Sequence, residues 1–193
     1  YLCAGVIPWG FFAELISREQ NVFLENANLL KKARFPRMAL PIIIAINATL
    51  NFTIIFALFL IFLIVAKLWP GWVILASVPL LGIQALLAIG IGILSGVLNV
   101  FFRDLGQMIS IFMQFWFWLT PIVYPEKILP EQIQTYIAVN PMHPIIAGFH
   151  KVFVNHEWPQ WSSLYYPLAL SLLLCLLAFH LFQRHEQDLV DEL

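Results

Sequence analysis

Four side chains in the last third of the chain are of the types that do catalytic or metal chemistry. His143, His150, His156 and Glu157 combine imidazole and carboxylate groups, which serve as metal ligands and as general acids and bases. The histidines are separated by seven and six residues, and these spacings match no metal-binding motif. His156 beside Glu157 is typical of a solvated pair at a helix end. We therefore predict no catalytic residues and no metal site, and a membrane enzyme that uses these histidines is the weakest alternative.

A second chemical feature is the cluster of cations in "LLKKARFPRMALP", residues 29–41. Lys31, Lys32, Arg34 and Arg37 can bind anionic phosphate groups, such as those of lipid headgroups or of a substrate. Lysine and arginine also gather in loops on the cytoplasmic side of a membrane, whatever else those loops do. Two interpretations stay open: a contact for a substrate headgroup, and a signal that only orients the chain.

Aromatic side chains form a third cluster, within "ISIFMQFWFWLTPIVYP". Aromatic residues at a membrane interface usually form an anchoring belt. Their flat apolar faces and polar handles also suit the C–H face of a sugar ring. The candidates for such a contact with a sugar are Phe112, Phe115, Trp116, Trp118 and Tyr124.

The elements that must position these groups are membrane-spanning helices. Hydrophobic residues make up 61% of the 193 positions and charged residues 11%, and the mean hydropathy is +0.85, far from the values of a soluble domain. A helix needs about 20 mostly apolar residues to cross the hydrocarbon core, so long uncharged runs predict the spans. We expect spans at 37–66, 72–98, 106–124 and 160–183, with a partial span at 1–19. The expected fold class is an all-α membrane protein, a polytopic helical bundle with a single transmembrane domain over 1–193.

The distribution of basic residues orients these spans. Most lysine and arginine residues fall on one side of the alternating topology, which the positive-inside rule makes cytoplasmic. They are Arg18, Lys31, Lys32, Arg34, Arg37, Arg103 and Arg184. Residues 20–36 are then a cytoplasmic helical loop, 125–159 an external segment with short re-entrant helices, and 184–193 a cytoplasmic tail. The net charge of −1 gives no reason to expect a nucleic-acid partner.

Few polar groups lie inside the expected spans. Asn47 and Asn51 are one helical turn apart, and we expect them to hydrogen-bond to neighbouring helices. Gly92 and Gly96 form a GxxxG pattern, which allows two helices to pack closely. These four residues are therefore interpreted as packing elements rather than as ligands.

Ionisable residues are absent from the middle of each complete span. Glu14 lies one turn before Arg18, and we expect the two to form a structural ion pair near the cytoplasmic boundary. Intramembrane ionisable groups are the usual mark of ion and proton pathways. Their absence argues against a proton-coupled pump or an ion channel.

Four motifs follow one another between the apolar runs: "NANLLKKARFPRMALP", "VFFRDLGQ", "WLTPIVYP" and "NPMHPIIAGFHKVF". In this order they resemble the membrane subunit of ABC-2 type exporters, and within that class the permeases that export O-antigen, capsular polysaccharide and teichoic acid. The resemblance covers essentially all of the chain and implies about five transmembrane helices here, against six in the complete protein. The chain is expected to be incomplete at its N-terminus, starting within what would be the second helix. "GFHKVF" departs from the family pattern, which often has arginine near the position of His150.

The resemblance also implies a partner that hydrolyses ATP. In such permeases the loop after the second span is a coupling helix that docks on a separate ATPase subunit, where ATP and Mg are bound. The permease chain itself has no cofactor, and this sequence has no G-x-x-x-x-G-K-[ST] loop for nucleotide phosphates. The expected coupling residues are Glu25, Asn28, Leu29, Leu30 and Phe35.

The same resemblance gives a location and an activity. The chain is expected to be a multi-pass protein of the bacterial cytoplasmic membrane that forms a homodimer. Its expected work is to export a lipid-linked cell-surface polysaccharide through a channel between the two permeases, as a transport subunit and not an enzyme. A permease of the same fold that moves a drug or a small lipid is the main alternative.

Overall fold

The computed structural model describes residues 1–31, 38–125, 137, 139–185 and 189, and every element within these ranges is helical. The expected all-α fold class is therefore confirmed. The elements are α1 (Leu2–Glu25), α2 (Ala27–Leu30), α3 (Ala39–Val65), η1 (Gly71–Ala76), α4 (Ser77–Phe101), α5 (Leu105–Leu119), α7 (Met142–His150), η3 (Lys151–Asn155), η4 (Trp161–Leu164) and α8 (Tyr165–Arg184).

Three helical runs are long and apolar enough to cross a membrane: Ala39–Val65, Gly71–Phe101 and Trp161–Arg184. They lie within a few residues of the spans expected at 37–66, 72–98 and 160–183. The fourth expected span, 106–124, corresponds to the shorter apolar helix α5, which ends at Leu119. α1 has 24 residues, enough to span, but it carries Glu14, Arg18 and Glu19 and is not among the three.

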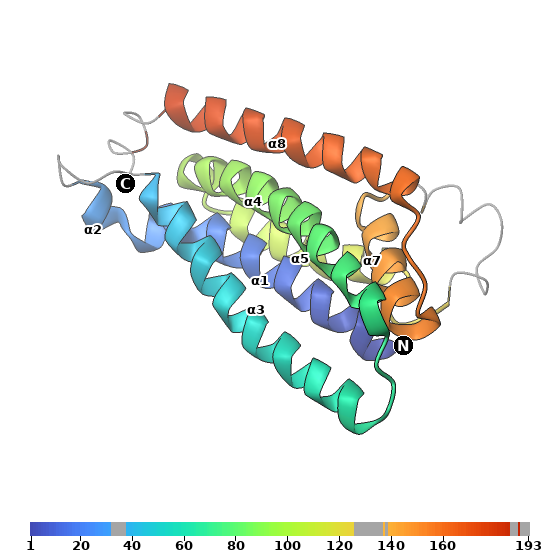
Figure 1. The fold of residues 1–193 in the computed structure, drawn as a ribbon. Helices are drawn as coiled ribbons and strands as arrows, with labels where there is room; N and C mark the ends of the chain where they lie inside the picture. Colours follow the sequence, from blue (N-terminus) through green and yellow to red (C-terminus); the bar gives the residue numbers. More distant parts are fainter. Residues whose placement is uncertain (32–37, 126–136, 138, 186–188, 190–193) are drawn as a thin grey trace.

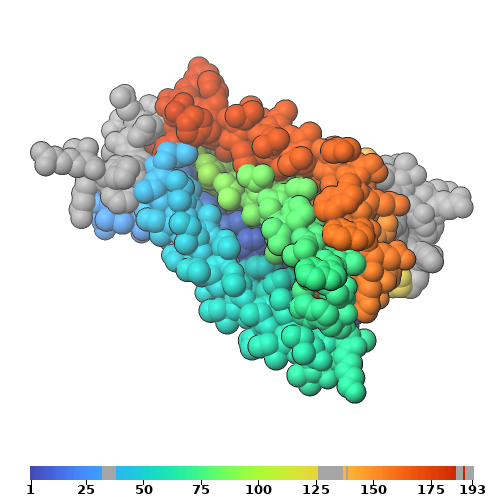
Figure 2. Space-filling view, viewed as in Figure 1, coloured from blue at the N-terminus to red at the C-terminus, as the bar shows by residue number. Residues whose placement is uncertain are grey.

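α1 and α4 form the centre of the bundle (Figure 1). α1 packs mainly against α4 and also against α3, α5 and α7, while α4 packs on its other side against α8. α3 contacts α4 little and splays away from it, so that α1 is visible at the floor of the depression between them (Figure 2). Because α1 is packed among apolar helices along its length, its polar residues lie at the depth of the spans.

Glycines set the closest approaches in the bundle. A Cβ placed on Gly90 of α4 would lie 2.9 Å from the Cβ of Leu174 on α8. On the opposite side of α4, a Cβ on Gly92 would lie 2.5 Å from the Cβ of Glu19, and one on Gly96 would lie 2.7 Å from the backbone oxygen of Glu19. The GxxxG pattern thus faces α1, and α4 fits between α1 and α8 because it lacks side chains at these contacts.

The cytoplasmic loop differs from its predicted form. The boundary expected between residues 19 and 20 falls inside α1, which continues without a break to Glu25. Asn26 ends the helix, with its side-chain amide donating to the backbone oxygen of Val22 at 2.9 Å. α2 then adds a single turn, Ala27–Leu30. Continuous packing of α1 on α4 extends the helix past the point at which its sequence becomes polar.

The external segment contains one of the two short helices that its sequence suggests. α7 continues directly into η3, a π-helical turn, so that Met142–Asn155 is one helical unit that ends at His156 in the left-handed conformation, with φ of 58°. The interior of this unit is apolar, with Ile145, Ile146 and Phe149 fully buried. Most of the expected preceding helix lies outside the described residues.

Candidate functional site

The expected coupling residues divide into an exposed set and a buried one. Glu25, Asn28 and Lys31 are exposed, and Leu29 is half-buried. Leu30 is only 2% exposed and belongs to an apolar cluster that also contains Phe23 and Phe182. Leu30 therefore anchors the turn, and the other side chains of α2 and its flanks form the surface that a partner can reach. Lys32, Arg34, Phe35 and Arg37 lie outside the described residues.

The aromatic cluster of α5 also divides. Phe112, Phe115 and Trp118 are more than half exposed. Trp116 is 8% exposed and packs edge-on against Phe12 of α1, with ring centroids 5.4 Å apart. Because an indole in this position is enclosed by the bundle, Trp116 holds α5 on α1, while its exposed neighbours face outward.

Asn140 connects the end of α5 to the start of α7. Its side-chain oxygen accepts from the indole nitrogen of Trp116 at 2.8 Å and from the backbone nitrogen of Met142 at 3.0 Å. Its amide donates to the hydroxyl oxygen of Thr120 at 2.8 Å. The sequence signal for this role is an asparagine and a proline directly before a helix, where asparagine commonly caps the first turn. A cavity of about 340 Å³ adjoins this connection and includes Phe112 and Leu119 in its lining.

Tyr124 lies beyond the end of α5 and is partly exposed. Its hydroxyl donates to the backbone oxygen of Trp118 at 2.7 Å. This bond folds the "TPIVYP" segment back onto the end of the helix, so that Tyr124 and Trp118 lie together at the outer end of the bundle.

Asn99 holds the turn between α4 and α5. Its amide donates to the backbone oxygen of Gln20 on α1 at 3.0 Å, and its oxygen accepts from the backbone nitrogen of Gly106 at 2.9 Å. One buried side chain thus ties α1, α4 and α5 together at the level of "FFRDLGQ". Nothing in the hydrophobic pattern distinguished Asn99, which is why the sequence analysis missed it.

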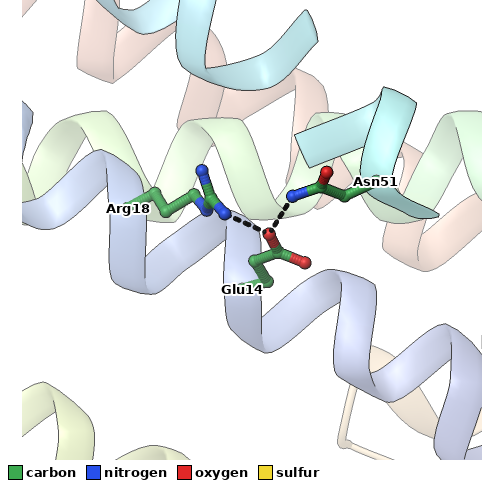
Figure 3. A network of polar contacts seen from close by, with 3 residues as sticks. All are labelled: Glu14, Arg18 and Asn51. Atoms are coloured by element: carbon green, nitrogen blue, oxygen red, sulfur yellow. Dashed lines mark hydrogen bonds and ion pairs between the residues drawn. The ribbon is translucent and has the colours of Figure 1, made fainter. Parts of the chain in front are cut away.

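A charged network lies between α1 and α3 (Figure 3). One carboxylate oxygen of Glu14, Oε1, accepts from the guanidinium of Arg18 at 2.8 Å and from the side-chain amide of Asn51 at 3.1 Å. Asn47, one turn before Asn51, is exposed on α3. Asn51 is therefore the polar residue of α3 that reaches across to α1.

The depth of this network corrects the sequence analysis. Asn51 lies near the midpoint of the 27 residues of α3, about 18 Å from its start at 1.5 Å per residue. The ion pair was expected near the cytoplasmic boundary, but the structure places it beside the middle of α3 rather than at the end of that helix. Glu14 is the first charged residue in the sequence, and it suggested that the apolar run ends there. In the structure, Arg18 and Asn51 both bind the Glu14 carboxylate, and α1 continues past Glu14 to Glu25.

The histidines of the external segment lie in two environments. His156 and Glu157 are exposed, as expected of a solvated pair. His143 and His150 line a cavity of about 440 Å³ together with Lys151 and Asn155. Burial lowers the pKa of His150 below its usual value, because the uncharged imidazole is favoured away from water. Among the described residues, no group of three His, Cys, Asp or Glu side chains is placed to hold a metal ion.

Comparison with known proteins gives a consistent result. Residues 1–154 match the family described as ABC-2 type transporter. The chain is similar to the O-antigen export system permease protein RfbA of Klebsiella pneumoniae, with 31% identity over 156 residues, covering 80% of this chain and 60% of that protein. It is also similar to the O-antigen export system permease protein RfbA of Myxococcus xanthus, with 24% identity over 195 residues, covering 100% of this chain and 75% of that protein.

Proposed function

Because the chain belongs to the ABC-2 type transporter family, we propose that it is the membrane subunit of an ATP-driven exporter of a lipid-linked cell-surface polysaccharide. The family and the apolar helices together make it a multi-pass protein of the inner membrane. The chain spans 60% of the length of the Klebsiella pneumoniae relative, so the activity of the whole protein is part of the proposal.

The observation that carries the proposed substrate is similarity to two permeases whose names specify O-antigen export. A physical requirement supports it, because a sugar chain cannot cross hydrocarbon unless its hydroxyl groups find hydrogen-bond partners on the way. A path between two copies of the permease would supply these partners. The exposed aromatic rings of Phe112, Phe115 and Trp118 would offer apolar faces to the sugar rings near the outer end.

The energy source is proposed to be a separate ATPase subunit that binds ATP and Mg. The sequence has no phosphate-binding loop of the G-x-x-x-x-G-K-[ST] type. The single turn of α2 carries the exposed Asn28 and the half-buried Leu29, and the exposed Glu25 and Lys31 flank it. Together they offer a surface on which such a subunit can dock. Because α2 follows α1 after one residue, movement of the docked subunit would be transmitted directly to the centre of the bundle.

The basic residues after α2 are proposed to meet the substrate before it crosses. Lys31 is exposed at the cytoplasmic end, next to the segment that contains Lys32, Arg34 and Arg37. Cations at this level attract phosphate groups at the membrane surface. The lipid-linked phosphate of the substrate would be held there, and neutralising Arg34 and Arg37 together should weaken stimulation of the ATPase by substrate.

Affinity purification of the full-length chain from its native host tests the proposed partner. The chain, solubilised gently, should co-purify with an ATPase that carries a phosphate-binding loop, at one copy of each subunit. A chain with Asn28→Trp should lose the ATPase, while a matched change on the outer face of α3, Leu58→Trp, should retain it. Recovery of the wild-type chain without an ATPase, under conditions that preserve other transporter complexes, would contradict the proposal.

A further inference from the structure

We propose that the exposed polar face around Glu14, Arg18 and Asn51 is a contact site within the membrane for the hydroxyl groups of a carbohydrate chain. This inference rests on the proposed function, and it assigns to a specific site the contacts that such a substrate needs. The charges of α1, their exposure and the polar residues that continue along the same face each support it.

The first support is the combination of depth and exposure. The side chains of Arg18 and Glu14 are 45% and 28% exposed, although Asn51 places them near the middle of α3. Charged groups at this depth almost always face the bundle interior or a water-filled cavity. An ion pair with only a structural role would be enclosed by its neighbours, whereas this pair presents nearly half of the Arg18 side chain outward. Among the described residues nothing covers this face, and we infer that it meets water or polar groups rather than lipid.

The second support is the chemistry that the network leaves available. Arg18 and Asn51 both bind Oε1 of Glu14, and the second carboxylate oxygen has no partner among the residues that the structure describes. A guanidinium has five N–H donors, and the ion pair with Glu14 leaves most of those of Arg18 unused. A carboxylate that accepts from hydroxyl groups, beside a guanidinium that donates to their oxygens, matches a molecule with many neighbouring hydroxyls.

The third support is the polar stripe along α1. Gly10, Glu14, Ser17 and Asn21 follow the i, i+4, i+7, i+11 spacing of one helix face, and none of the four is buried. At the outer end of this stripe, the position of a Cβ on Gly10 has no heavy atom within 4 Å, so the face is open there. An exposed stripe without large apolar side chains is unlike the lipid-facing surface of α3, where Ile54 is 63% exposed.

The stripe continues toward the outside into an aromatic surface. Ser110 and Gln114 of α5 are exposed beside α1. A cavity of about 380 Å³ between the two helices is lined by Gln114 together with Trp9 and Trp118. A sugar chain that leaves the charged network would thus meet indole faces next, which suit the C–H faces of its rings. Hydrogen-bonding groups and aromatic faces then follow one another along one path.

Cysteine labelling of the full-length permease, together with its ATPase in the native host, tests the site. Ser17→Cys is made in a cysteine-free background of the full-length chain, in which Cys3, Cys175 and any further cysteine are replaced by alanine. A charged, membrane-impermeant thiosulfonate is applied to inverted membrane vesicles, and labelling is read from the purified chain. The matched control is Ile54→Cys, one turn from Asn51 on the outer face of α3. We expect Ser17→Cys to react at least tenfold faster than Ile54→Cys, because only the former meets water.

The same labelling, with glycan synthesis switched on or off in the host, separates a substrate contact from a water-filled defect. Substrate in the path should slow the labelling of Ser17→Cys at least threefold. Equal rates in the two hosts, or labelling of Ser17→Cys as slow as that of Ile54→Cys, would overturn the proposal. A face covered by a second copy of the chain would give the slow rate in both hosts.

Export by a charge-free variant gives an independent test. Glu14→Gln combined with Arg18→Gln keeps side chains of similar length but removes both charges. We expect at least a tenfold loss of surface glycan per copy of permease in the membrane, with an unchanged melting temperature. Normal export by this variant would overturn the contact site. If instead the wild-type permease fails to restore surface glycan to a host that lacks it, the proposed function itself is wrong.

Discussion

Gly92→Ala tests whether close packing of α4 on α1 holds the centre of the bundle. The added Cβ would lie 2.5 Å from the Cβ and 3.0 Å from the Cγ of Glu19. Ordinary contact begins near 3.4 Å, so α1 and α4 must separate by about 1 Å. Overpacking of this kind costs about 1–3 kcal/mol, and replacing a helical glycine by alanine returns about 0.5–1 kcal/mol.

The net loss is about 0–2.5 kcal/mol, and a middle value of about 1 kcal/mol corresponds to a melting temperature lower by roughly 2–4 °C for a domain of this size. The assay is thermal unfolding of the full-length protein in detergent. Gly82→Ala is the matched control, because it lies in the same helix and an added Cβ there meets nothing within 4 Å. Glu19→Gly in the Gly92→Ala background should relieve the clash, and a double-mutant cycle would measure the coupling. Equal melting temperatures for Gly92→Ala and Gly82→Ala would refute the packing argument.

Three further predictions concern the two ends of the bundle. Leu29→Asp should abolish export while the chain still inserts, because Leu29 lies at the proposed docking surface. Leu30→Ala should cost about 2–5 kcal/mol of stability because Leu30 is 2% exposed. Export assays and thermal unfolding check the pair, and normal export by Leu29→Asp would refute its role. Asn140→Ala should lower stability by about 1–3 kcal/mol, because it removes the hydrogen bonds of the Asn140 side chain to Trp116, Thr120 and Met142. The control Asn47→Ala, on the exposed face of α3, should have little effect on thermal unfolding. Burial lowers the pKa of His150, so as the pH falls below 6.5 the unfolded chain takes up a proton before the folded one, and stability decreases. The melting temperature should thus drop between pH 7.5 and 5.5, and His150→Gln should show a smaller drop; equal drops would contradict this assignment.

The spans could be predicted from the sequence because their signal is local. An uncharged run of sufficient length specifies a helix in lipid whatever its neighbours are, and the ends of α3 and α8 follow from the first polar residues beyond the runs. α5 was predicted longer than it is, since "TPIVYP" is apolar enough to continue a run. The hydrogen bond from the Tyr124 hydroxyl to the backbone oxygen of Trp118 folds this segment back, and counting apolar residues cannot predict that bond.

The position of the charged network could not be predicted in the same way. Glu14 and Arg18 look like the end of a span when each charge is counted by itself. In the structure, Asn51, which is 37 positions away in the chain, meets the same carboxylate and makes the charges tolerable at depth. The position of the charged network depends on which helices are neighbours and on their register. A single sequence does not specify either.

In the candidate site, too, some features follow from the local sequence and others depend on contacts between distant segments. The rings of Phe112, Phe115 and Trp118 and several side chains around α2 are exposed, as the contacts predicted for them require. Trp116 belongs to the same aromatic run but is buried against α1, because every third or fourth residue of α5 must face the bundle. Asn99 was not predicted to matter, and Asn140 could be placed only at a break between helices, because both act through bonds to segments that are distant in sequence.

The measurement that tests the central claim most directly is the location of the glycan in a host from which this permease gene has been deleted. Surface polysaccharide and the cytoplasmic pool of its lipid-linked form are quantified with and without the full-length gene supplied in trans. The exporter account predicts loss of surface glycan and accumulation of the lipid-linked form inside, both reversed by the wild-type chain but not by Leu29→Asp. Unchanged surface glycan in the deletion host, with no internal accumulation, would contradict it.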